Sequence, residues 1–244
     1  MTALRVSVVA MVLPACAAPA VATATGVRDD VIVNGDEAVA ALLPVEFSRG
    51  APTVLFPGNA YQGVLEVPAY AAIWLLRGPD LLLLRLFHQV VWVAALAVWF
   101  VAALEPARRS GRVSDRAYWW SAFAVAGLLG ITSVVGWPVW FRVYPGYQLG
   151  ALLGGLAVLV AVRPGAQRHL RWWFVAGVLA GAAVYAQPMH AAATAVVLCL
   201  AASAGRSGVV RRIAIATCGV VVGVGPLLIW NLRNGMATLD PGAG

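Results

Sequence analysis

The sequence contains no lysine and few charged residues of any kind, which argues against a soluble protein. Of its 244 residues, 11% are charged and 61% are hydrophobic, and the mean hydropathy is +0.84. Soluble proteins carry about 25% charged residues, and a surface facing water cannot be covered with so few. The composition therefore predicts a membrane protein with several spans.

Cysteine and the distribution of charge exclude further classes. Cys16, Cys199 and Cys218 lie inside apolar stretches without the spacing of metal ligands, so neither a disulfide framework nor a zinc site is indicated. The net charge of +7 comes from 17 basic residues, all arginine, against 10 acidic ones. Because these arginines fall in short clusters between apolar stretches, we expect no nucleic-acid partner.

Long apolar stretches predict an all-α polytopic transmembrane helix bundle of about seven spans. A hydrocarbon core of about 30 Å needs about 20 mostly apolar residues per helix. Such stretches occur at residues 6–25, 81–104, 117–136, 147–162, 172–186, 189–204 and 213–230. The turn at Gln187 and Pro188 leaves open whether the fifth and sixth stretches are two spans or one long kinked helix, and we favour two.

The arginines also predict orientation, because cytoplasmic loops are enriched in basic residues. Eleven arginines fall before span 1 or between spans 2 and 3, 4 and 5, and 6 and 7, against four on the other side. This places the N-terminus in the cytoplasm and the chain in the plasma membrane as a multi-pass protein. Residues 1–25 read either as a first transmembrane anchor or as a signal peptide with a small-residue cleavage site at Ala22-Thr23-Ala24.

The longest polar segment, residues 26–80, is then an external loop. Its polar part, residues 26 to about 67, holds six of the ten acids of the chain, namely Asp29, Asp30, Asp36, Glu37, Glu46 and Glu66. Residues 38–43 are expected to form a short amphipathic helix that breaks near Pro44. Residues 67–77 are apolar but too short to span and suit an interfacial helix, and Asp80 is placed to cap the helix that begins at Leu81. The bundle then occupies residues 81–235, with an external tail at 236–244.

Several polar residues fall at the external membrane interface on this topology. They are Arg85, His88, Arg142, Tyr144, Tyr147, Gln187, His190, Asn231 and Arg233. A guanidinium suits phosphate because its planar fork donates two parallel hydrogen bonds. We expect Arg85 and Asp36 to face a common pocket at the outer leaflet, although Arg85 could instead snorkel to headgroups and a lone His190 could be purely structural.

The external loop resembles that of a known enzyme superfamily. Residues 34–38 (Asn-Gly-Asp-Glu-Ala) and 56–66 (Phe-Pro-Gly-Asn-Ala-Tyr-Gln-Gly-Val-Leu-Glu) are similar to the first external loop of GT-C membrane glycosyltransferases, in particular bacterial relatives of protein O-mannosyltransferases and aminoarabinose transferases. Arg85 matches an arginine that opens their second span, residues 142–147 resemble their Arg-x-Gly-Gly-Tyr turn, and residues 225–235 resemble the exit of a later helix. The similarity covers about residues 30–239.

The resemblance implies transfer of a sugar from a polyprenyl-phosphate donor to an acceptor lipid, glycan or protein on the outer face, with inversion. It assigns the catalytic positions to Asp36, as base, and Glu37, which holds the loop or the sugar. Substrate-binding positions would be Tyr61, Glu66, Arg85, His88, Arg142, Tyr147, His190 and Asn231. No ligand cluster indicates a metal, although the acidic loop could hold a divalent cation.

The number of spans departs from the family pattern. Members usually have eleven or more, so the chain resembles their N-terminal part, and a partner chain could supply the missing helices. Two other functions fit the same helices. One is a non-catalytic membrane scaffold, and the other is a transporter subunit, which no mid-span acid supports. Glycines four residues apart, at Gly150, Gly154, Gly177 and Gly181, favour close helix packing in each case.

Overall fold

The computed structural model describes residues 35–59, 61–112, 114–115, 118, 145–205 and 207–239. The expected span at residues 6–25 lies outside these described residues, and so does that at 117–136 apart from Tyr118. Within them the fold is all-helical, as predicted, with eight α-helices, two short 3-10 turns and a single isolated bridge between Leu55 and Gly63.

The helices follow the expected order. The predicted external loop, called the external segment from here on, contains α2 (Gly35–Ser48) and α3 (Val67–Arg77), and α4 (Leu81–Arg109) follows directly. The second half of the chain contains α7 (Tyr147–Val162), α8 (Pro164–Arg168), α9 (Leu170–Ala186), η1 (Pro188–His190), α10 (Ala191–Ser203), α11 (Val209–Arg233) and η2 (Ala237–Leu239). The predicted bounds of α3 and α7 are confirmed, as are two separate helices, α9 and α10, on either side of Gln187.

Two of these helices have the dimensions of a membrane span. In the part of the chain that the structure describes, α4 and α11 are long and apolar enough to cross a bilayer, whereas α7, α9 and the η1–α10 segment are apolar but shorter. Asp80 caps α4 as expected, because its Oδ1 accepts hydrogen bonds from the backbone N–H groups of Leu82 and Leu83 at 2.8 and 3.2 Å. The structure thus supports an apolar helical protein with two candidate spans.

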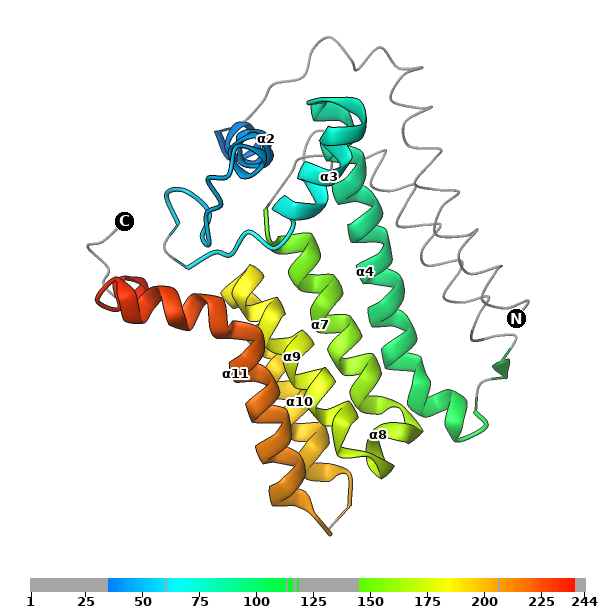
Figure 1. The fold of residues 1–244 in the computed structure, drawn as a ribbon. Coiled ribbons are helices and arrows are strands. Elements are labelled where there is room, and N and C mark those ends of the chain that lie inside the picture. Colours follow the sequence, from blue (N-terminus) through cyan, green and yellow to red (C-terminus); the bar gives the residue numbers. More distant parts are fainter. Residues whose placement is uncertain are drawn as a thin grey trace.

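Figure 1 shows the arrangement of the helices. Helices α4, α7, α9 and α11 pack successively against one another, and α10 packs against α7, α9 and α11. Helix α8 lies at one end of this bundle, while α2, α3 and the segment between them cover the opposite end (Figure 1). The external segment therefore sits over the ends of α4, α7 and α9 that lie farthest from Arg108 and Arg109, which end α4.

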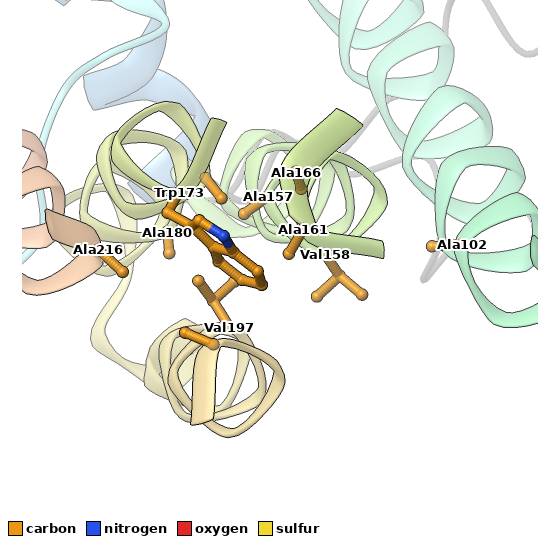
Figure 2. Close-up of a cluster of buried hydrophobic side chains, with 11 residues drawn as sticks. Ala102, Ala157, Val158, Ala161, Ala166, Trp173, Ala180, Val197 and Ala216 are labelled. Atoms are coloured by element: carbon orange, nitrogen blue, oxygen red, sulfur yellow. The ribbon is translucent and has the colours of Figure 1, made fainter. Parts of the chain in front are cut away.

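The bundle core consists mainly of small residues around one large side chain. Trp173 on α9 is 1% exposed, and Figure 2 shows its ring among alanines and valines of the neighbouring helices. Ala157 on α7, Val197 on α10 and Ala216 on α11 are fully buried beside it. Alanine at these positions lets the helix backbones approach closely, so the packing depends on shape and leaves little room for larger residues.

Glycines bring α9 and α11 into backbone contact. A Cβ atom at Gly177 would overlap the carbonyl oxygen of Ala216, and one at Gly219 would overlap that of Phe174. Gly181 and Gly223 meet the opposite backbone in the same way. The predicted close packing at Gly177 and Gly181 is confirmed, with an α11 partner pair that has the same four-residue spacing.

The expected break of the first external helix at Pro44 is wrong. Helix α2 continues through Pro44 to Ser48. Proline removes one backbone hydrogen bond from a helix interior, but here Pro44 is buried together with Ala40 and Leu43, which pack against α3 and the start of α4. The apolar contacts offset the lost hydrogen bond. Helix α11 likewise contains Pro226, and its last part, drawn in red, turns away from the bundle in Figure 1.

Candidate functional site

A cluster of buried polar side chains lies where the external segment meets the ends of α4, α7 and α9. Its members come from α2, the segment between α2 and α3, α4 and α7, and are Glu37, Gln62, Glu66, Arg85, His88 and Gln148, each no more than 8% exposed. Buried polar groups are stable only when hydrogen-bonded or paired. The partners of these six side chains therefore determine how the external segment is held.

An ion pair joins α2 to α4. The Nε of Arg85 donates to Oε1 of Glu37 at 2.9 Å, and its Nη2 donates to Oε2 at 2.7 Å. Both side chains are buried, with Glu37 completely inaccessible to solvent. This fork-to-carboxylate arrangement is the strongest geometry that an arginine and a carboxylate can form. It places Arg85 against Glu37, where two of its nitrogens are already engaged.

Asp36 lies one residue earlier in the first turn of α2 and is exposed. Successive residues on a helix project about 100° apart, so burying Glu37 against Arg85 turns Asp36 toward solvent. Among the described residues, no ion pair or hydrogen bond joins Asp36 to Arg85. The structure therefore separates the two acids of the pair: Glu37 is an anchor, and Asp36 is accessible.

A second chain of hydrogen bonds joins α3, α4 and α7. The Nδ1 of His88 lies 3.2 Å from Oε1 of Gln148, and the hydroxyl of Tyr70 contacts the Nε2 of His88. A neutral imidazole that donates from Nδ1 to Gln148 accepts at Nε2 from the Tyr70 hydroxyl, so one tautomer satisfies all three groups. His88 is thus a buried link between three helices and is inaccessible to a substrate in this structure.

Glu66 joins the external segment to the N-terminus of α7. Its Oε1 accepts a hydrogen bond from the backbone N–H of Gly146 at 2.5 Å. Burial raises the pKa of Glu66 to about 7, against the opposing effect of its two backbone hydrogen bonds. Gly146 has φ of 77° and faces the carbonyl of Ala186 too closely for a Cβ atom, so only glycine fits there.

The remaining predicted site residues are not members of this cluster. Tyr61 and Tyr147 are 44% and 42% exposed at the same end of the bundle. The Nε2 of His190 donates to the carbonyl of Tyr147 at 3.0 Å, which links η1 to α7. Asn231 lies in the last turn of α11, where its Nδ2 donates to the carbonyl of Leu227 and its Oδ1 accepts from the backbone N–H of Thr238, each at 3.0 Å. Arg142 lies outside the described residues.

Two members of the cluster, Gln62 and Gln148, and one partner of the cluster, Tyr70, were not identified as site residues from the sequence. Gln62 donates to the carbonyl of Pro145, and Gln148 and Tyr70 hold His88. Gln148 carried a signal, since it is a polar residue in the first turn of an otherwise apolar helix, where its burial needs a partner. Tyr70 and Gln62 carried none, because their partners are far away in the sequence.

The site offers no metal centre within the described part of the chain, where no three His, Cys, Asp or Glu side chains gather closely enough to hold an ion. No protein-family model, curated protein or solved structure matches the chain. The arrangement that remains is an exposed carboxylate, Asp36, on a helix that the buried Glu37–Arg85 pair anchors.

Proposed function

We propose that the protein is a membrane glycosyltransferase, or the N-terminal part of one, which transfers a sugar from a polyprenyl-phosphate donor at the outer face of the membrane. The observation that supports this most is the buried Glu37–Arg85 pair, which fixes α2 and leaves the neighbouring Asp36 accessible. A catalytic base has to be held in place and has to be accessible to the acceptor, and the exposed position of Asp36 on this anchored helix supports that role. The resemblance of residues 34–66 to the GT-C external loop points to the same residue.

The membrane setting is supported by the two candidate spans, α4 and α11. Helix α4 carries Asp80 at one end and Arg108 and Arg109 at the other. With basic residues on the cytoplasmic side, α2 and α3 lie at the outer surface. Leu75 and Leu76 at the end of α3 are 79% and 86% exposed, which fits the interfacial position proposed for that helix.

In this proposal Asp36 acts as general base. Its carboxylate withdraws the proton of the acceptor hydroxyl while that oxygen attacks the anomeric carbon of the donor sugar. The bond from this carbon to the lipid phosphate breaks, the configuration inverts, and the polyprenyl phosphate leaves with the electron pair. The proton stays on Asp36 until solvent removes it.

The structure changes the part proposed for Arg85. Because its Nε and Nη2 are engaged by Glu37, Arg85 positions α2 and is not available as a free phosphate-binding fork. Arg142 remains the proposed cation for the leaving phosphate. Tyr61 and Tyr147, which are exposed at the same end of the bundle, are the proposed contacts to the sugar or acceptor.

The test is sugar transfer in membranes that contain Asp36→Asn. Labelled hexose and pentose polyprenyl phosphates are supplied to membranes of matched protein content, and released polyprenyl phosphate is measured. Loss of a general base lowers the rate by about 10²–10⁴-fold. Glu46→Gln is the matched control, because Glu46 is an exposed acid on the same helix and pairs with the exposed Arg49. Transfer that is undiminished in Asp36→Asn, or no transfer from any donor with the unaltered protein, contradicts the proposal.

A further inference from the structure

Glu66 is a buried carboxyl group with an unused oxygen. It is 3% exposed, its Oε1 accepts from the N–H of Gly146, and its Oε2 has no hydrogen-bond partner among the residues that the structure describes. A buried oxygen of an ionised carboxylate without a partner is costly. As a neutral acid, the group avoids most of that cost.

The segment around Glu66, residues 62–66, is held against the ends of two helices, and we call this attachment its seating. The N–H of Gly63 donates to the carbonyl of Tyr185 at 2.8 Å, and the side-chain amide of Gln62 donates to the carbonyl of Pro145. These contacts place residues 62–66 between the N-terminus of α7 and the C-terminus of α9. The same segment leads from α2 to α3, so its seating also fixes where α2 lies.

Little positive charge faces Glu66 in this position. From α7, the backbone N–H of Gly146 points at it, at a helix N-terminus that carries about half a positive charge. From α9, Tyr185 is the titratable side chain that interacts electrostatically with Glu66, and its hydroxyl donates to the carbonyl of Val54. Within the described ranges, no cationic side chain contributes to the titration of Glu66.

We propose that Glu66 is a positioning residue which seats the external segment as a neutral acid, so that loss of its proton loosens the segment that carries Asp36. Glu66 touches neither donor nor acceptor; it acts through the placement of residues 62–66. This inference rests on the proposed function for its consequence in catalysis, but the seating itself is independent of any sugar chemistry.

The direction of the pH effect follows from burial. The pKa of Glu66 is about 7 when the segment is seated, against 4.5 for an exposed glutamate. Seating is therefore strongest below about pH 4.5, weakens as pH rises toward 7, and changes little above that. For such a difference in pKa, the equilibrium between seated and released segment falls roughly ten- to a hundredfold between pH 5 and pH 7.

Hydrogen exchange tests this on the full chain in phosphatidylcholine nanodiscs. The amides of Gly63 and Gly146 donate in two of the three hydrogen bonds that hold the segment, so their protection factors, corrected for the intrinsic pH dependence of exchange, report whether the segment is in place. In the unaltered protein we expect protection to fall roughly ten- to a hundredfold from pH 5 to pH 7. Glu66→Gln, which imitates the neutral acid, should stay protected throughout, and Glu46→Gln should behave as the unaltered protein.

Several results would overturn the inference. Equal protection factors of Gly63 and Gly146 at pH 5 and pH 7 in the unaltered protein overturn it without any variant. The test is therefore decisive even if Glu66→Gln fails to fold. A fall in the protection of Gly63 and Gly146 in Glu66→Gln that is as large as in the unaltered protein also overturns the inference. The transfer assay separates the two proposals: pH-dependent protection without sugar transfer leaves the seating intact and refutes the enzyme. If both hold, the transfer rate declines from pH 5 to 7 in the unaltered protein and stays level in Glu66→Gln.

Discussion

Replacing Glu37 by glutamine removes one charge of the buried ion pair while keeping the shape of the side chain. Arg85 would then be a buried cation, 5% exposed, without its counter-ion. Breaking a buried pair in this way costs about 3–5 kcal/mol, because the remaining charge is left uncompensated. Glutamine still accepts one hydrogen bond, so we expect the lower end of that range for the free energy that holds α2 against α4.

The assay is hydrogen exchange of the α2 amides in detergent micelles. A loss of about 3 kcal/mol corresponds to about a hundredfold faster exchange of amides that open with α2. Glu46→Gln is the control on the same helix. Its partner Arg49 is 69% exposed, and exposed pairs contribute about 0–1 kcal/mol, so exchange should change less than about fivefold.

A second replacement separates lost attraction from a stranded charge. Adding Arg85→Met to Glu37→Gln removes the unpaired cation and should recover much of the protection lost in Glu37→Gln, since replacing a buried pair by apolar groups is often close to neutral. If the α2 amides exchange at the same rate in Glu37→Gln and Glu46→Gln, the Glu37–Arg85 pair does not hold α2 and does not position Asp36.

Two further predictions concern the bundle. Gly177→Ala puts a methyl group onto the backbone of α11 at Ala216 and should lower the free energy of unfolding by about 1–3 kcal/mol. Gly225→Ala, with open space around the added methyl group, should raise the free energy of unfolding by up to about 1 kcal/mol. Equal effects of the two variants would contradict the close packing of α9 on α11. Arg212 is 7% exposed and donates three hydrogen bonds to carbonyls around the C-terminal end of α10. Arg212→Met should therefore lower the free energy of unfolding, measured by denaturant titration, by at least about 2 kcal/mol. Arg211 is exposed, so Arg211→Met should leave that free energy nearly unchanged.

Local features of the sequence predicted the helices well. The start of α4 followed from Asp80, whose side chain caps the first turn through contacts only two and three residues away. Helix α7 was bounded by a glycine and an arginine at the ends of an apolar run, and its predicted range is confirmed. Such signals act within a single turn of helix, so composition and spacing are enough to find them.

The contacts of the site depend on residues far apart in the sequence. Glu37 and Arg85 are 48 positions apart, and Glu66 and Gly146 are 80 apart. Which acid of the Asp36-Glu37 pair turns inward depends on the rotation of α2, and apolar packing of Ala40 and Leu43 fixes that rotation together with the contact to Arg85. The continuation of α2 through Pro44 has the same cause.

Sugar transfer at the outer face requires α2 to lie outside the cell. This is tested most directly by labelling in intact cells with a membrane-impermeant maleimide, in a background with Cys16, Cys199 and Cys218 replaced by serine. Arg49→Cys, at an exposed position after α2, should be labelled without permeabilisation. Arg211→Cys, exposed near the start of α11 at the other end of the bundle, should be labelled only after lysis. The reverse pattern would place Asp36 in the cytoplasm and contradict transfer at the outer face.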